Sequence, residues 1–244
     1  MIKKLILFIL LSLCLVFQAS AWNPMITTSG TSGTSVFSCT GYDICQNLEA
    51  VGYDNGETWN ETLNQATIDE NYSASPIVGA QSLQVVDGGT DGNVYATVDT
   101  SGFSDGDTLY GYFQVRVDTD TTGAIVQMVN FYDWSSDVGD ISLSDAGAIN
   151  SHHGSVSDTG STNISGGGVF HIWWEFKTET GAGDNGVLKV WVSATSTKPE
   201  TPEIDASDGN GDFVAIDRYY IWARGASTIV YDKILIDRTQ IGSF

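Results

Sequence analysis

The chain is poor in positive charge. Its 244 residues include 10 Lys and Arg against 30 Asp and Glu, which gives a formal net charge of −20. Two of the ten basic residues, Lys3 and Lys4, lie in a leader that carries no acidic residue, so the rest of the chain has a charge of −22. A surface this acidic repels nucleic acids, anionic membranes and polyuronates, and it favours solubility in a salty medium. The composition therefore predicts no nucleic-acid partner.

Long apolar runs are also lacking beyond the leader. The apolar run from Leu5 to Phe17 follows the basic pair and precedes Ala19-Ser20-Ala21, a small-x-small cleavage pattern. The run is too short to span a bilayer, and no stop-transfer segment follows it. Cys14 does not fit a lipoprotein signal, because Leu13 stands where a small residue is expected. We expect residues 1–21 to be a signal peptide and the mature protein to be secreted or at the cell surface, with no membrane contact after cleavage.

Cysteine is scarce: only Cys39 and Cys45 remain once the leader is removed. Two cysteines separated by five residues in an exported protein most simply form one small disulfide loop. A metal site would need more ligands than this neighbourhood offers. We expect a disulfide at the end of a Thr-, Ser- and Gly-rich leader, residues 22–44.

Helical periodicity is absent, whereas period-2 alternation recurs with turn signals roughly every 8 to 12 residues. In 108–117, for example, Leu109, Phe113 and Val115 share one parity and Tyr110, Tyr112, Gln114 and Arg116 the other. The expected strands are 81–86, 93–98, 108–117, 124–132, 215–223 and 228–237, with weaker ones near 141–143 and 153–156. These features predict an all-β domain, residues 45–244, folded as a two-sheet antiparallel β-sandwich.

The clearest pattern is a hairpin at 170–193. Apolar residues alternate in both halves, and Gly181-Ala-Gly-Asp-Asn-Gly186 between them can turn the chain back. A turn centred near Ala182 places Trp173 opposite Trp191 and Glu175 opposite Lys189. The outer face of the hairpin would then carry an aromatic pair beside an ion pair.

Several short motifs, in their order along the chain, carry a family resemblance. They are Gly52-Tyr-Asp-Asn-Gly-Glu-Thr-Trp59, Gln81-Ser-Leu83, the Trp-bearing hairpin, Ser196-Thr-Lys-Pro199 and Tyr231-Asp-Lys-Ile-Leu-Ile236. In these the chain resembles the concanavalin A-like lectin/glucanase superfamily, and within it the laminin-G-like jelly rolls of secreted and surface proteins. The likeness covers about residues 45–242. It implies two curved antiparallel sheets with ligands on the concave face or the rim loops.

A glycan-binding surface is the first functional hypothesis. Sugar rings stack on aromatic planes, and flanking polar groups bond their hydroxyls, so a sheet face with paired aromatics suits them. The alternative is that the same aromatics are covered and only pack. The candidate ligand-binding residues are Trp173, Trp191, Tyr110, Tyr112 and Gln114.

Two patterns suggest catalysis instead. Glu203-Ile-Asp205-Ala-Ser-Asp208 is similar to the Glu-x-Asp-x-x-Glu of retaining glucanases in this superfamily, but it ends in Asp and lies in an expected loop, 194–212. Polysaccharide lyases of this fold use Arg, Gln, His and Tyr, for which Arg116 and His171, with Gln114 and Tyr112, are the candidates here. Their extended motifs are missing, and the charge of −22 disfavours an anionic substrate.

Metal binding has one weak signal. Asp208, Asn210 and Asp212 recur at every second position, as calcium ligands do, yet Phe213 replaces the turn glycine and no bidentate Glu follows. A calcium loop and an acidic solvated loop both remain open, and no other cofactor is expected. His152 and His153 would point to opposite faces of a strand and cannot share one ion, so we expect them in a polar loop.

The leading hypothesis is therefore a secreted, non-catalytic β-sandwich that binds glycan or another extracellular surface ligand. One alternative is a structural or adhesive subunit, because the 22–44 leader could add as a strand to the sheet edge of another copy and so support self-association. The other is a polysaccharide-cleaving enzyme, either a glycoside hydrolase or a lyase, on the same fold.

Overall fold

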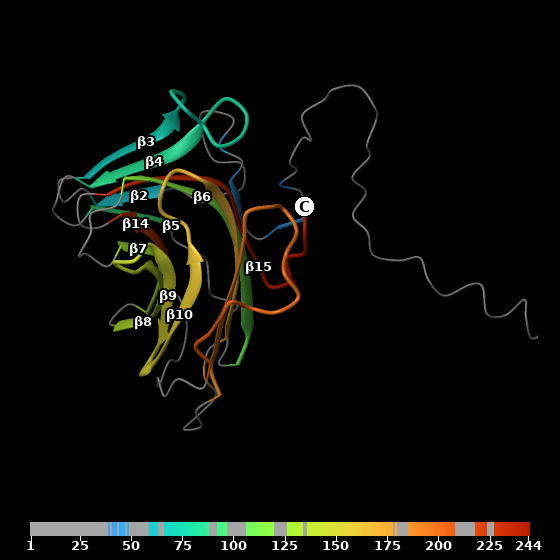
Figure 1. Cartoon of the computed structure of the whole chain (residues 1–244). Helices are drawn as coiled ribbons and strands as arrows, with labels where there is room; N and C mark the ends of the chain where they lie inside the picture. Colours follow the sequence, from blue (N-terminus) through green and yellow to red (C-terminus); the bar gives the residue numbers. More distant parts are fainter. Residues whose placement is uncertain are drawn as a thin grey trace, which may run out of the picture. The chain divides into compact units, whose positions relative to one another are not determined.

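A computed structural model describes residues 39, 41, 42, 44–46, 48, 59–62, 66–87, 92–96, 106–119, 126–133, 136–177, 179, 185–207, 218–223 and 227–244. All of them belong to one compact unit, Phe37–Phe244. Within these ranges the chain forms fifteen strands and no helix, so the predicted all-β class is confirmed (Figure 1). Consequently the described residues include no helix long and apolar enough to cross a membrane.

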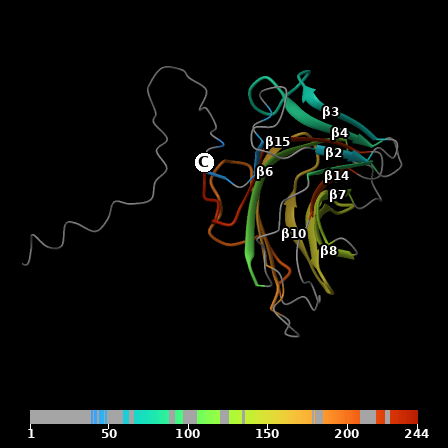
Figure 2. The same cartoon turned by 180° about the vertical axis from the view of Figure 1, so that it is seen from behind.

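The strands form two antiparallel sheets that stack face to face (Figures 1 and 2). Sheet A has the order β13 (Ile204–Asp205), β12 (Val187–Ser193), β11 (Val169–Lys177), β6 (Thr108–Thr119), β15 (Thr228–Asp237), β4 (Ser82–Asp87) and β3 (Ala66–Tyr72), and β1 (Ile44–Gln46) also pairs with β15. Sheet B has the order β10 (Val156–Asn163), β9 (Ala148–His153), β8 (Ser136–Leu143), β7 (Val126–Asp133), β14 (Arg218–Ala223), β5 (Gly92–Ala96) and β2 (Trp59–Thr62). This is the predicted β-sandwich.

The core lies between the sheets and is built from alternate residues, as the period-2 patterns predicted. From β6 it takes Leu109, Phe113, Val115 and Val117, all nearly inaccessible to solvent. Aromatic rings join the two layers, because Phe131 of sheet B lies with its ring centroid 5.0 Å from that of Trp174 and 4.5 Å from that of Phe176. Burying side chains of this size stabilises the fold by roughly 1.5–3 kcal/mol each.

The predicted hairpin register is confirmed. β11 and β12 pair antiparallel with Trp173 opposite Trp191 and Glu175 opposite Lys189. The ammonium group of Lys189 lies 3.8 Å from the Asp205 carboxylate on the next strand, β13. The centre of the turn lies outside the described residues.

The region around the two adjacent histidines differs from expectation. Strand β8 begins five residues earlier than the expected 141–143. The expected strand near 153–156 instead spans the end of β9, a turn at 154–155 and the start of β10. His152 and His153 therefore end strand β9 and do not lie in a polar loop. Alternation sends them to opposite faces, as predicted: His153 is fully buried, and the side chain of His152 is 33% exposed.

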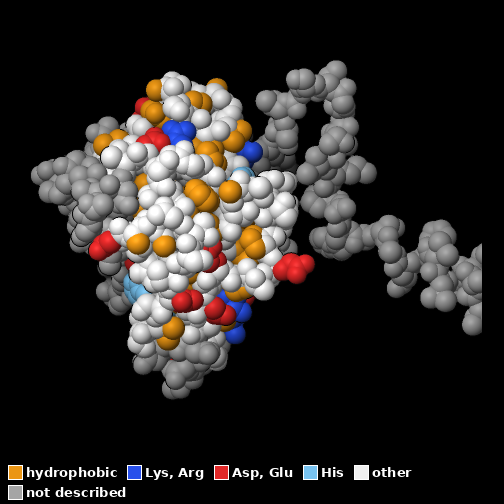
Figure 3. Space-filling view, viewed as in Figure 1, with side chains coloured by type: hydrophobic (Ala, Val, Ile, Leu, Met, Phe, Trp, Pro, Cys, Tyr) orange, Lys and Arg blue, Asp and Glu red, His pale blue; other side chains and the backbone are white. Residues whose placement is uncertain are grey.

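The face in view in Figure 3 is mixed in character. Hydrophobic side chains appear there in small separated groups, with acidic side chains between them. Scattered single apolar groups of this kind are normal on a soluble protein.

Candidate functional site

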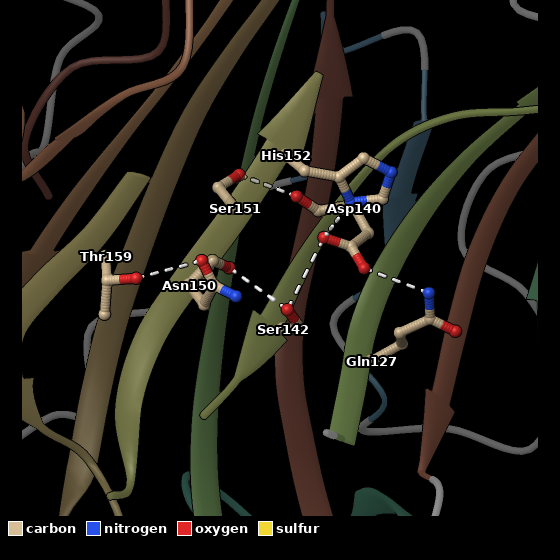
Figure 4. Close-up of polar contacts among 7 residues, drawn as sticks. All are labelled: Gln127, Asp140, Ser142, Asn150, Ser151, His152 and Thr159. Carbon is tan, nitrogen blue, oxygen red and sulfur yellow. Dashed lines mark hydrogen bonds and ion pairs between the residues drawn. The ribbon is translucent and has the colours of Figure 1, made fainter. Parts of the chain in front are cut away.

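A polar row crosses the outer face of sheet B, the face turned away from the core. In β8, Ile141 and Leu143 belong to the core, so Asp140 and Ser142, which alternate with them along the strand, face outward. The antiparallel register continues the row onto β9 by pairing Asp140 with His152 and Ser142 with Asn150. Figure 4 shows these side chains on neighbouring strands.

The Asp140 carboxylate organises this row. It accepts a hydrogen bond from Nε2 of Gln127 at 2.9 Å and lies 2.8 Å from Nδ1 of His152 (Figure 4). The hydroxyl of Ser142 donates to it at 3.4 Å. Asp140 is only 4% exposed, and a buried carboxylate needs several partners of this kind to offset its lost hydration. The carboxylate therefore fixes the orientation of the side chains around it.

The row descends from the surface towards the middle of the sheet. At its outer end Thr159 of β10 is exposed and donates to Oδ1 of Asn150 at 3.2 Å. At its inner end Gln127 of β7 is 9% exposed. The carboxamide oxygen of Gln127 is buried and accepts no hydrogen bond from the part of the chain that the structure describes. A buried acceptor without a partner is costly, so this end of the row favours an additional donor.

The imidazole of His152 has an orientation suited to ligand contact or proton transfer. The Asp140 carboxylate accepts a hydrogen bond from Nδ1–H of His152 and so fixes the orientation of the ring. An imidazole oriented in this way is a common group for ligand contact or proton transfer.

Beyond β7 sheet B continues through β14 and β5, which pair in antiparallel register with their neighbours.

The predicted aromatic residues lie on the other sheet and form one row there. Tyr112, Trp173 and Trp191 are register partners on β6, β11 and β12 of sheet A. They do not form the open outer face that we expected. Trp173 is fully buried, Trp191 is 6% exposed and Tyr112 is 1% exposed.

Irregular chain from two parts of the sequence covers this aromatic row. The indole Nε1 of Trp173 donates to the carbonyl oxygen of Gly242 at 3.0 Å, and the ring centroids of Phe244 and Tyr112 are 4.5 Å apart. Cys39 and Tyr42 also pack on this aromatic cluster. Tyr110, at the edge, is only partly buried, and its pKa is raised by burial and by the nearby Glu175. The aromatic pair therefore exists as predicted, but the folded chain covers it.

The candidate lyase residues also share this face, yet most of them are hydrogen-bonded to other groups of the protein. The hydroxyl of Tyr112 and Nδ1 of His171 are 2.8 Å apart. Burial raises the pKa of Tyr112, and burial together with Lys233 lowers the pKa of His171, so a neutral hydroxyl and a neutral imidazole share this hydrogen bond. Arg116 is held by Asp118, with N–O distances of 2.5 and 3.0 Å, and by the carbonyl of Ser75 at 2.8 Å.

The candidate glucanase residues serve the backbone. One carboxylate oxygen of Glu203 accepts hydrogen bonds from the amides of Ser161 and Thr162, at 2.7 and 2.5 Å. Asp205 accepts from the amide and hydroxyl of Ser207. The two carboxylates flank Ile204 in the short strand β13 and do not lie in a purely irregular loop.

The remaining predictions concern the disulfide and the metal. Cys39 and Cys45 form the predicted disulfide, with their Cα atoms 5.3 Å apart. Asp208, Asn210 and Asp212 lie outside the described residues, so a calcium loop there stays a prediction. Across the ranges that the structure describes, no three His, Cys, Asp or Glu side chains are grouped so that they could hold a metal ion.

The sequence patterns did not predict the Asp140-centred row. A signal is present, because Asp140 and Ser142 alternate with Ile141 and Leu143, but the expected strand begins only at 141. For His152 the sequence predicted a polar loop and no role in a site.

Comparison with solved structures identifies similar folds. The chain resembles an endo-β-1,4-glucuronan lyase from the fungus Trichoderma reesei (TM-score 0.53, 12% identity, 82% of this chain and 92% of that chain). It also resembles the cellulose induced protein Cip1 (TM-score 0.58, 13% identity, 82% of this chain and all of that chain). A third similar structure is the receptor binding domain of botulinum neurotoxin mosaic serotype C/D (TM-score 0.57, 8% identity), of which the match spans 48%.

These similarities establish the fold only, because the identities are low. They agree with a jelly-roll arrangement of strands and confirm the predicted β-sandwich. No protein-family model matches the chain, and a search of curated proteins found no match.

Proposed function

We propose that this chain is a secreted protein that binds a neutral glycan on the outer face of sheet B. The observation that carries the proposal is the row ordered by the buried Asp140 carboxylate of β8, in which His152 and Asn150 of β9 and Gln127 of β7 present hydrogen-bonding groups on the two sides of that strand. A glycan offers hydroxyls that donate and accept along a line, which suits such a row. Export follows from the expected signal peptide and agrees with the disulfide.

Charge selects the class of glycan. The mature chain carries a charge of −22, so a polyuronate would be repelled over most of the surface. Among the proteins of similar fold, one is named for cleaving glucuronan, and another, a botulinum neurotoxin type C (TM-score 0.52, 8% identity), is described as depending on two ganglioside molecules for cell entry. Carbohydrate chemistry on this fold supports a glycan ligand here, and the acidity of this chain favours a neutral one.

Affinity electrophoresis tests the proposal. The mature protein, residues 22–244, is run through gels cast with neutral polysaccharides (β-glucans, xylan, galactomannan) and acidic ones (alginate, pectin). We expect retardation by at least one neutral polymer and at least a tenfold weaker effect for the Asn150→Ala, His152→Ala variant. Thr195→Ala, an exposed change in the loop that follows β12 of the other sheet, is the matched control. Equal retardation of parent and double variant would place the ligand elsewhere.

A second candidate is cleavage of the bound glycan, favoured by the bond between Asp140 and His152. A histidine whose ring is oriented by a carboxylate is a common proton-transfer group. Release of reducing ends from a retained polymer, lost in His152→Ala while retardation persists, would establish this activity. Retardation without release leaves binding as the function.

A further inference from the structure

The covered face of sheet A has the layout of a carbohydrate platform. Tyr112, Trp173 and Trp191 lie side by side on three adjacent strands, and neighbouring strands are about 4.8 Å apart, so the aromatic row is roughly 10 Å long. The centroids of the Tyr112 and Trp173 rings are 5.2 Å apart. A row of this length matches about two sugar rings of a linear chain, and aromatic faces bind the apolar face of each ring.

Polar groups border the aromatic row on both sides. Two residues along β11 in one direction, His171 lies opposite Gln114 of β6. Two residues in the other direction, Glu175 lies between Tyr110 of β6 and Lys189 of β12. An aromatic stripe between two polar stripes offers stacking for the rings and hydrogen bonds for their hydroxyls.

The segment 238–244 lies along this row. Phe244 contacts Tyr112 on β6, Gly242 accepts from Trp173 on β11, and residues 240–243 line a hollow of about 310 Å³ beside Trp191 on β12. The segment therefore crosses three strands in the direction that a linear ligand would take. A sugar could replace both kinds of contact. Its apolar face could stack where the Phe244 ring lies, and a hydroxyl could accept from the Trp173 indole N–H in place of the Gly242 carbonyl.

The segment is lightly held and leaves bonding capacity unused beneath it. Ile241 is its one buried side chain, and its other anchors include the bonds from the Phe244 amide to the Ser196 carbonyl (3.0 Å) and from the Lys198 amide to the Ser243 hydroxyl (2.9 Å). Beside the segment the indole N–H of Trp191 is buried without a hydrogen-bond partner among the described residues, and the same holds for the carboxamide oxygen of Gln114 at the border of the aromatic row. Unpaired buried groups are costly, and they make the present cover imperfectly complementary.

We propose that the row of Tyr112, Trp173 and Trp191 is a second glycan site, closed by the segment 238–244 and opened when that segment is displaced by a linear neutral oligosaccharide. The segment competes with the ligand for the same contacts, so the apparent affinity of the closed protein is lowered by the fraction of molecules that are open. This site is separate from the one on sheet B and does not depend on it.

The test loosens the segment in the full mature chain. Phe244→Ala removes a half-buried ring without touching the core between the sheets, and Ile241→Asp with Phe244→Ala releases the segment more fully. Binding of three linear neutral hexaoses, of β-1,4-glucose, β-1,3-glucose and β-1,4-mannose, is measured by calorimetry. We expect at least one to bind the loosened variants about tenfold more tightly than the parent. Thr239→Ala, an exposed change in the same segment, should leave affinity unchanged.

Added substitutions assign the gain to a face. Trp191→Ala in the Phe244→Ala background should abolish the gain, whereas His152→Ala in that background should leave it intact. Equal affinity of parent and loosened variants for all three hexaoses would overturn the inference. A gain that His152→Ala removes would also overturn it, while supporting the site on sheet B. If Ile241→Asp prevents folding, Phe244→Ala alone decides.

Discussion

Two adjacent histidines show how far the surroundings of a residue determine its chemistry. His152 and His153 are consecutive, yet strand alternation places one beside a carboxylate on the outer face and the other in the core. Burial lowers the pKa of His153 to about 4, and the neighbouring His152 adds to the decrease. Its ring centroid lies 5.0 Å from that of Phe176, among apolar groups that favour the neutral form.

This burial predicts a pH-dependent stability. The pKa of His153 is about 4 in the folded protein and about 6.5 in the unfolded chain, so the unfolded state binds more protons between these values. The free energy of unfolding should therefore fall by about 3 kcal/mol as the pH is lowered from 6.5 to 4. Urea unfolding at several pH values checks this. The His153→Gln variant should lack that part of the pH dependence, and an identical slope would show that His153 titrates normally.

Gly111 provides a second prediction for a single residue. A Cβ added there would lie 1.8 Å from Cε2 of Trp174, a core side chain that is 1% exposed. We expect Gly111→Ala to lower the free energy of unfolding by about 2–3 kcal/mol, because the indole must leave its packed position. Gly242→Ala is the matched control, since a Cβ there meets no atom within 4 Å, and it should cost less than about 0.5 kcal/mol. Similar midpoints for both variants in denaturant would contradict the packing described.

Among the elements, β10 depends on a side chain from the other sheet. Glu203, next to β13, accepts hydrogen bonds from two successive amides of β10, those of Ser161 and Thr162. Asp158 of β10 returns a bond by accepting from the Asp205 amide at 3.0 Å. These contacts join the edge strands of the two sheets. The Glu203 carboxylate is thus hydrogen-bonded to backbone amides, whereas a catalytic acid would need to face the substrate.

Glu203→Ala should therefore loosen β10. Two amides would lose a charged acceptor, which costs about 1–3 kcal/mol, and hydrogen exchange at Ser161 and Thr162 should accelerate. The exposed neighbour Glu200 gives the control substitution, Glu200→Ala, which should change neither. Unchanged hydrogen exchange in Glu203→Ala would mean that the hydrogen bonds of Glu203 do not stabilise β10. If the protein cleaves a glycan, its activity should survive Glu203→Ala.

The elements differ in how far the sequence could predict them. The hairpin register followed from two alternating runs around a glycine-rich turn, because a one-residue slip would move every apolar side chain to the other face. Strands β8 to β10 were harder, since their outward residues are Ser, Asn, Asp and Thr, which are also typical of loops. The candidate site lies on these strands, so the weakest sequence signal falls on the surface for which we propose ligand binding.

For the molecule as a whole, the two outer faces of the sandwich are different. On sheet A, irregular chain covers the aromatic row and places Trp173 out of reach. No periodic pattern marks a segment that will cover a sheet, so the sequence could predict the aromatic row but not its burial. On sheet B, His152 and Asn150 keep access to solvent beside a buried carboxylate. We therefore propose that the protein binds its ligand on sheet B as long as the segment 238–244 covers the aromatic row.

The most direct test is a two-dimensional NMR titration of the assigned mature protein with a hexaose of the neutral polysaccharide that retards it in gels. We expect the changes in amide chemical shift to concentrate on Asp140, Ser142, Asn150, His152 and Thr159. The Asn150→Ala, His152→Ala double variant should abolish these changes. Shifts confined to Tyr112, Trp173 and Trp191 in the unaltered protein, or no shifts at saturating hexaose, would contradict a glycan site on sheet B.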